Sequence, residues 1–321
     1  KNTVKNIYPA YISLEKLFWQ QLDVFMVDTQ LMAKLHESEF KDTYDYVDKL
    51  PLIRNRNLVP SLKIAILSAD SRGHACSSIR IESVLNCLNG ECEYRYILRP
   101  FINDDGEYEV FTDKESVEWA DLIIIQRTAA QYENIDVLEI IFASDSIIVY
   151  ETDDLLTEPL PESNVLHTSF KKHVSCIREV VRKANLITVS TPYLERHMSD
   201  LNSNIKVLPN LVDNKVWKTI RPRVPEKREG KLKILYAGTA THIADLESIE
   251  SALFRLHTKY QDKIELVFAG CITDKLKSIS TLALKRGVPY GKYAAIVQNI
   301  GADIALAPLV DNPFNNSKSN V

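Results

Sequence analysis

Several features that would assign the protein to a class at once are missing from its sequence. The 321 residues contain no apolar run near the roughly 20 residues that span a bilayer, and no opening segment reads as a secretory leader. A formal net charge of -4 argues against a nucleic-acid binder that relies on neutralising phosphates. The five cysteines form no Cys-x-x-Cys pair of the kind that binds zinc or supports redox chemistry. We therefore expect a cytoplasmic protein with reduced thiols and no nucleic-acid partner.

Short apolar runs alternate with helix-sized intervals along most of the chain, a pattern typical of parallel sheets covered by helices on both faces. With 45% hydrophobic and 26% charged residues, the composition is that of a globular protein long enough for two domains. The predicted fold class is α/β, with two Rossmann-like parallel-sheet domains facing a cleft. The expected strands lie at residues 63–67, 94–98, 121–126, 146–150, 186–190, 205–208, 232–236, 264–269, 302–307 and, more weakly, near 287–290.

The same pattern predicts where the domains begin and end. Residues 1–60 have helical spacing of apolar and aromatic residues, and we interpret them as a helical extension or connector. This stretch could serve a membrane surface or a partner, but its interspersed acidic residues favour a cap on the next domain. The amino-terminal domain is then 61–217, and the proline-broken, charged segment 218–230 is a linker. The carboxyl-terminal domain begins at 231.

A strand, a small-residue turn and a helix follow one another at residues 232–256. The turn contains Gly238, Thr239, Thr241 and His242, and it lies where a parallel sheet presents its carboxyl edge. A helix amino terminus at that edge offers unpaired N–H groups to an anion, and glycine lets the backbone approach a phosphate. The turn therefore indicates a phosphorylated ligand, although the same junction occurs at ordinary corners of parallel sheets.

Charged residues also follow the predicted strand at 146–150. Asp153 and Asp154 lie there, where they could bind a metal ion, bind an acceptor, act as a general base, or simply cap a corner. Arg80 and Arg127 lie near the same edge and could grip an anion or pair with a carboxylate. For Arg127 we favour the pairing role. His74, in the loop after the first strand, is either a catalytic base or a solvated histidine.

Six stretches resemble the nucleotide-sugar-dependent retaining glycosyltransferases of the GT-B fold, glycosyltransferase group 1 or family 4. They are residues 148–156, 184–198, 207–217, 234–246, 266–270 and 302–320, so the resemblance runs from about residue 62 to the end. It implies transfer of a sugar from a nucleoside-diphosphate sugar to a glycan or lipid-linked glycan in surface polysaccharide biosynthesis. It also implies retained anomeric configuration, no cofactor and no metal. Such an enzyme would be cytoplasmic or peripheral at the inner face of a membrane.

The resemblance also assigns roles to particular residues. The donor phosphates would face the turn at Gly238, Thr239 and His242. The donor sugar and phosphate would contact the loop that follows the strand at 302–307, at Asp311, Phe314, Asn315, Lys318 and Ser319. Acceptor binding would fall to Arg80, Asp153 and Asp154, and the catalytic candidates are Lys318, Asp153 and His74. Lys318 would neutralise the leaving diphosphate, unless it is only a solvated lysine.

Two departures from the family pattern leave other functions open. Many relatives carry an arginine and a lysine after the first strand of the second domain, whereas here no cation follows the turn before Arg255. The stretch from Lys231 onward is short for a complete domain, so we expect a truncated chain or one module of a larger enzyme. A non-catalytic scaffold module is therefore the main alternative. A nicotinamide-dependent oxidoreductase is disfavoured because neither first turn reads Gly-x-Gly-x-x-Gly.

Overall fold

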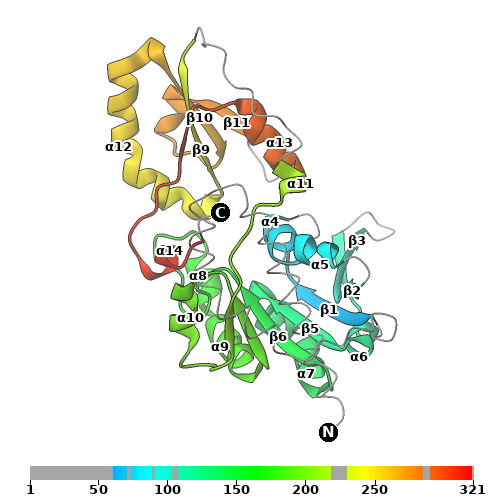
Figure 1. The fold of residues 1–321 in the computed structure, drawn as a ribbon. Coiled ribbons are helices and arrows are strands. Elements are labelled where there is room, and N and C mark those ends of the chain that lie inside the picture. The colour runs from blue at the N-terminus through cyan, green and yellow to red at the C-terminus, as the bar shows by residue number, and fades with distance from the viewer. Residues whose placement is uncertain are drawn as a thin grey trace, which may run out of the picture.

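The structure, a computed structural model, describes residues 61–70, 74–88, 91–102, 108–217, 230–284 and 290–319 (Figure 1). The predicted helical extension at residues 1–60 lies outside this part of the chain, as does nearly all of the predicted linker at 218–230. The described residues form two parallel sheets and one antiparallel hairpin. The predicted α/β class with two Rossmann-like sheets is therefore confirmed, while the predicted domain boundaries stay predictions.

The first sheet has six parallel strands in the order β2-β1-β5-β6-β7-β8. Because β2 lies on one side of β1 and β5 on the other, the strand order reverses at β1, where open α/β sheets bind ligands. The strands are β1 (Leu62–Ser68), β2 (Cys92–Tyr96), β5 (Leu122–Gln126), β6 (Ile147–Thr152), β7 (Leu186–Val189) and β8 (Ile205–Val207).

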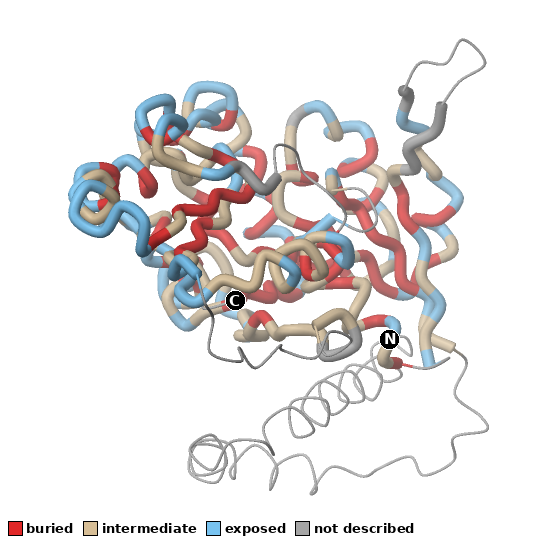
Figure 2. The backbone as a smooth tube through the Cα atoms, turned by 90° about the horizontal axis from the view of Figure 1, so that it is seen from above, coloured by how far each residue is buried: buried red, intermediate tan, exposed pale blue. Residues whose placement is uncertain are grey.

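Apolar residues on both faces of β1 explain why this sheet is buried from both sides. Ile64 and Ile66 join one hydrophobic cluster, whereas Ala65 and Leu67 join the larger cluster on the opposite face. This is the period of two that a strand imposes on its side chains. Fully burying a side chain such as Ile66 contributes about 1.5–3 kcal/mol. Buried backbone runs through the centre of both sheets in Figure 2.

Short helices cover the first sheet. After β1 the chain forms one continuous helical stretch of α4 (Ala75–Ser77), a π-helical turn η1 (Ser78–Glu82) and α5 (Ser83–Cys87). The other helical elements are η2 (Arg127–Ala129), η3 (Tyr132–Asn134), α6 (Glu115–Trp119), α7 (Ile135–Ala143), α8 (His167–Lys171), α9 (Val174–Lys183), α10 (Pro192–Met198) and α11 (Asn214–Trp217). Among the described helices, none combines the length and apolar character needed to cross a membrane.

An antiparallel hairpin beside this sheet was not predicted. It consists of β3 (Leu98–Ile102) and β4 (Tyr108–Thr112), and the strand predicted at 94–98 is β2, two residues earlier. The sequence does carry a signal, because Asp105-Gly106 is a common hairpin dipeptide between two runs of strand-forming residues.

The second sheet has four parallel strands in the order β11-β10-β9-β12. They are β9 (Leu232–Gly238), β10 (Ile264–Gly270), β11 (Thr281–Leu284) and β12 (Ile304–Leu306). Helix α12 (Ile243–Tyr260) packs on one face, and α13 (Tyr290–Ile300) contributes its apolar residues to a smaller cluster on the other. Shorter elements are η4 (Ala240–His242), η5 (Gln261–Lys263), η6 (Leu276–Ile279) and α14 (Pro313–Asn316).

One predicted strand in this region was misplaced. The weak strand signal near residues 287–290 corresponds to β11 at Thr281–Leu284, and Tyr290 begins helix α13 instead. Residues 285–289 lie outside the described part of the chain. The misplacement has a simple cause, since a run of alternating small and apolar residues this short suits a strand or a helix turn equally well.

Candidate functional site

Arg127 lies at the centre of a charged cluster at the carboxyl edge of the first sheet. It follows β5, and its guanidinium donates from Nη1 to Asp153 Oδ1 (2.9 Å) and from Nη2 to Asp154 Oδ2 (2.6 Å). These ion pairs match the interpretation of Arg127 as a strut. Its backbone has a φ of 50°, the left-handed region that non-glycine residues rarely occupy, and such strain concentrates at functional sites.

Asp154 is held as a carboxylate by the cations around it. Burial alone would raise its pKa, but the charges of Arg127 and Lys318 outweigh burial and lower the pKa of Asp154 below its usual range, with His242 adding to the effect. Asp154 therefore lies where the fields of three cationic or basic side chains meet. Lys318 and His242 come from the second domain, so this carboxylate joins the two sheets electrostatically.

Arg80 holds the segment that leads from the first domain toward the second. Its side chain, only 4% exposed, donates from Nε to Glu151 Oε1 (2.6 Å) and from Nη1 to Asn210 Oδ1 (2.8 Å) and to the Leu208 carbonyl. Burial raises the pKa of Glu151, although Arg80 opposes the shift. In the described part of the chain, Glu151 Oε2 has no hydrogen-bond partner. Arg80 thus acts as a buried strut, and its contact with an acceptor stays a prediction.

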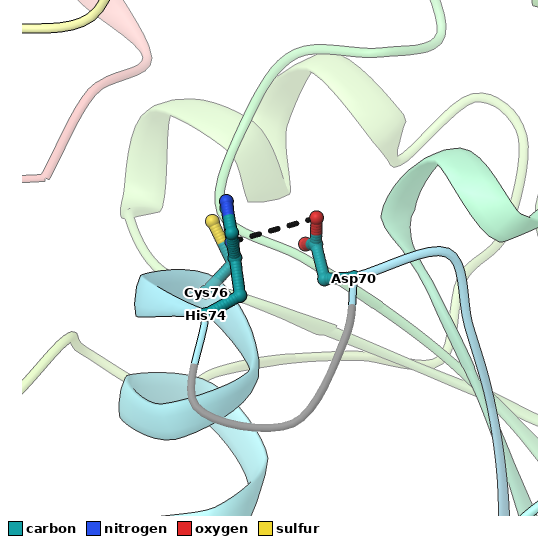
Figure 3. Close-up of side chains that lie close together, drawn as sticks. All are labelled: Asp70, His74 and Cys76. Atoms are coloured by element: carbon teal, nitrogen blue, oxygen red, sulfur yellow. Dashed lines mark ion pairs between the residues drawn. The ribbon is translucent and has the colours of Figure 1, made fainter. Parts of the chain in front are cut away.

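His74, Asp70 and Cys76 approach one another after β1 (Figure 3). The imidazole is mostly exposed, its Nδ1 lies 3.5 Å from Asp70 Oδ1, and the three possible ligand atoms lie within 4.8 Å of one another. The Cys76 sulfur, however, accepts a hydrogen bond from the Arg127 guanidinium, and burial raises the pKa of this thiol to about 12. A protonated thiol beside a guanidinium is a poor metal ligand. The absence of a metal site stays a prediction, as does a catalytic role for His74.

The residues from Val310 to Ser319, here called the strap, connect the two domains. At its start, the strap is bound to the second domain, because Val310 N and Asn315 Nδ2 each donate to Asp245 Oδ1 at 2.8 Å. Within it, the side chain of Asn312 accepts from Asn315 N and caps the short helix α14. Figure 1 draws α14 beside α8 and α10 of the first domain.

At its end, the strap is bound to the first domain. Ser317 accepts hydrogen bonds from Leu155 N through its hydroxyl (3.3 Å) and from the Thr191 hydroxyl through its carbonyl (3.2 Å). Asn210 Nδ2 donates to the Ser319 hydroxyl at 2.9 Å. The end of the strap therefore lies at the carboxyl edge of the first sheet.

Lys318 is the strap residue that reaches the charged cluster. Its Nζ donates to Asp154 Oδ1 at 2.6 Å and lies 4.3 Å from the centroid of the Phe314 ring, a cation–π contact. The side chain is 22% exposed, so the alternative of a freely solvated lysine is wrong. Phe314 itself packs against the core of the first domain.

Two other predicted donor residues of the strap differ in where they lie. Asn315 is buried and bound to Asp245, so it supports the strap from within. Asp311 is exposed and accepts a hydrogen bond from Asn316 Nδ2 at 2.9 Å. Among the described residues, it makes no hydrogen bond or ion pair with the charged cluster. The two roles at the donor sugar stay predictions.

The turn after β9 lies opposite the loop after β6. Asn164 Nδ2 donates to the Thr241 carbonyl at 3.5 Å, which connects the carboxyl edges of the two sheets. The hydroxyls of Thr239 and Thr241 bond to each other at 2.7 Å, and neither caps the helix. A Cβ at Gly238 would lie 2.8 Å from the Tyr236 hydroxyl, so glycine here makes room for a neighbouring side chain. Close approach of a phosphate to Gly238 stays a prediction.

Asp245 is the functional candidate that the sequence analysis missed. It lies in the first turn of α12, and its Oδ2 is 2.8 Å from His242 Nδ1 while its Oδ1 holds the strap. A signal was present, because His242 and Asp245 are three residues apart and so lie on the same face of a helix. The site therefore consists of Asp153, Asp154 and Arg127 from one domain, and Asp245, His242 and the strap from the other.

No model of a known protein family matches the sequence. No curated protein matches it significantly either. Among solved structures, the chain is similar to an α,α-trehalose-phosphate synthase (UDP-forming) from Burkholderia vietnamiensis, with 10% identity, a TM-score of 0.49, and 81% and 82% of the two chains covered. The corresponding protein of Burkholderia multivorans gives 11% identity, a TM-score of 0.47 and the same coverage. TarM gives 10% identity and a TM-score of 0.32 over 68% of this chain and 43% of TarM. At these similarities, the fold class rests on the two parallel sheets themselves.

Proposed function

We propose that the protein is a glycosyltransferase that transfers a sugar from a nucleoside-diphosphate sugar to a glycan or another acceptor. One observation carries the proposal: the strap places the Lys318 ammonium of the second domain on Asp154 of the first, close to the turn that opens α12. An ammonium, an imidazole and the positive end of an 18-residue helix thus converge from the donor side. This is the combination that a leaving diphosphate requires.

In this proposal, each domain has its own share of the chemistry. Lys318 and His242 stabilise the charge that develops on the diphosphate as the glycosidic bond to it breaks. Asp153, bound by Arg127 and facing Asn210 Nδ2 at 3.5 Å, presents a carboxylate to the acceptor hydroxyl. The acceptor oxygen bonds to the anomeric carbon on the face that the diphosphate leaves, so the anomeric configuration is retained, and the departing phosphate accepts the acceptor's proton. The proposed step uses neither a protein nucleophile nor a metal. In the proposal, the acceptor is an intermediate of surface polysaccharide biosynthesis, and the transfer takes place in the cytoplasm or at the inner face of a membrane.

A nucleotide screen tests the proposal directly. The chain is titrated by thermal shift and calorimetry with UDP, GDP, dTDP, CDP, ADP and NAD, each with and without Mg²⁺. Binding of one nucleoside diphosphate without Mg²⁺ is the expected result, and hydrolysis or transfer from the matching nucleotide sugar would follow. Binding of NAD alone would favour an oxidoreductase. If none of the nucleotides binds, a scaffold module would be favoured.

Replacing Lys318 by methionine should weaken nucleoside diphosphate binding by about tenfold to a hundredfold. A hydrogen bond to a charged group contributes about 1.5–3 kcal/mol, and methionine keeps the length of the side chain without its charge. The free nucleoside should bind as before, since Lys318 contacts only phosphate in the proposal. Lys277→Met removes an exposed lysine that pairs with Asp274 in the same domain, and it should leave both affinities unchanged. Equal losses in the two variants would show that only net charge matters.

A further inference from the structure

Asp245 fixes which nitrogen of His242 carries a proton. An ionised carboxylate can only accept, so the 2.8 Å contact between Asp245 Oδ2 and His242 Nδ1 requires a proton on Nδ1. Asp245 is itself held in place, because its side chain is almost fully buried and its other oxygen accepts from Val310 N and Asn315 Nδ2. The ring of His242 therefore has one orientation, with Nε2 as its remaining polar atom.

Nε2 of His242 has no hydrogen-bond partner among the described residues, and the side chain is 26% exposed. Among the described residues, the charged groups near the ring are Asp245 on its own helix and Asp154 from the loop after β6, and Lys318 and Arg127 already pair with Asp154. The Tyr236 hydroxyl of β9 donates to the His242 carbonyl. Asn164, the neighbour across the turn, is uncharged. An anion that binds at this turn therefore contacts His242 Nε2, a nitrogen that can accept a proton. The Asp245 carboxylate on the other side of the ring stabilises the imidazolium that results.

We propose that Asp245 is the positioning residue for a proton-dependent diphosphate contact: it orients His242 so that Nε2 takes up a proton from solvent as the diphosphate binds. This inference rests on the proposed function and deepens it. The turn itself carries no arginine or lysine, so His242 is the side chain of the turn that can add a positive charge toward a bound anion.

The arrangement makes two substitutions informative. In Asp245→Asn, the amide oxygen can still accept from Val310 N and Asn315 Nδ2, so the strap keeps its anchor. The amide nitrogen then faces His242 Nδ1 and donates to it, which leaves the ring neutral with its proton on Nε2. His242→Gln removes the titrating group and retains a neutral donor. His257→Gln, near the other end of the same helix, is the matched control.

Calorimetry in two buffers of different ionisation enthalpy measures the proton uptake directly, with the nucleoside diphosphates of the screen and inorganic pyrophosphate as probes. The wild type and His257→Gln should take up as much as one proton per diphosphate, and their affinity should fall as the pH rises. Asp245→Asn and His242→Gln should each bind about tenfold more weakly with no proton uptake, and the double variant should be no weaker than either single one.

Several outcomes separate this inference from the proposed function. Binding of a nucleoside diphosphate with no proton uptake, or with uptake that persists in Asp245→Asn, overturns the inference and leaves the proposed function standing. Proton-linked binding of pyrophosphate alone supports the inference and contradicts the nucleotide donor. Failure of every probe to bind overturns both. Melting temperatures identify a variant that does not fold, and His242→Gln, at a partly exposed ring, then decides the question.

Discussion

Replacing Arg127 by methionine should destabilise the protein by about 3–5 kcal/mol, the usual cost of removing one partner of a buried ion pair. Arg127 is the cation shared by Asp153 and Asp154; among the described residues, its removal leaves Asp154 paired with Lys318 and leaves Asp153 without an ion-pair partner. Urea unfolding followed by circular dichroism measures the loss. Arg182→Met, which breaks an exposed ion pair with Glu179, is the control and should change stability by less than about 0.5 kcal/mol.

The pH dependence of the Arg127 variant gives a second test. Because the folded protein lowers the pKa of Asp154, this group contributes stability above its unfolded pKa of about 3.9, and the contribution is lost as the pH falls through the lower folded value. Removal of Arg127 raises the folded pKa of Asp154, so the deficit of the variant should be largest near neutrality and should shrink in acid. A deficit that is independent of pH would indicate lost packing instead of lost charge pairing.

Replacing Gly270 by alanine should destabilise the second domain by about 3–5 kcal/mol, although only one methyl group is added. Gly270 has a φ of +103°, and a Cβ there would lie 2.1 Å from the carbonyl oxygen of its strand neighbour Gly238. That oxygen also accepts from Cys271 N, so the clash would separate the ends of β9 and β10. Equilibrium unfolding and nucleotide binding should both report the damage, since the turn after β9 begins at this point.

Gly291 supplies the matched control for the Gly270 variant. It lies in α13, and a Cβ at this position meets nothing within 4 Å. Gly291→Ala should therefore stabilise the protein by up to about 1 kcal/mol, because alanine is the better helix former. The same chemical change is thus expected to have opposite signs at two glycines of one domain. Similar effects at both positions would contradict the role of backbone geometry at Gly270.

Most of the fold could be predicted from the sequence because its main signals are local. Runs such as the one forming β1 are apolar on both faces, which identifies a buried parallel strand without knowledge of its neighbours. The errors lie where the local signal is weak or divided. The sequence between β3 and β4 is polar, and β11 is only four residues long. In both places, pairing with another strand decides the structure, and a single sequence does not reveal pairing.

The candidate site was predicted less completely than the fold. The chain positions of Asp153, Asp154 and Lys318 were identified, but their contact joins residues more than 160 positions apart, and no spacing rule reaches that far. For the same reason, Arg80 was expected to contact an acceptor, although it is buried against Glu151. Asp245 was overlooked because acidic residues are common in the first turn of a helix, where they interact favourably with the helix dipole. Its presence there therefore did not indicate a functional role.

The strap also limits how far the two domains can move apart. Val310 is bound to the second domain and Lys318 to the first, and the eight Cα-to-Cα steps from one to the other span at most about 27 Å when fully extended. Because Ser317 is bound to Leu155 and Thr191 of the first domain, Lys318 stays near Asp154 even if the ion pair breaks, at an effective concentration of about a millimolar or more. A free anion must compete with this intramolecular partner, so small anions at low concentration are excluded. A nucleotide, which adds contacts of its own, has the means to displace it.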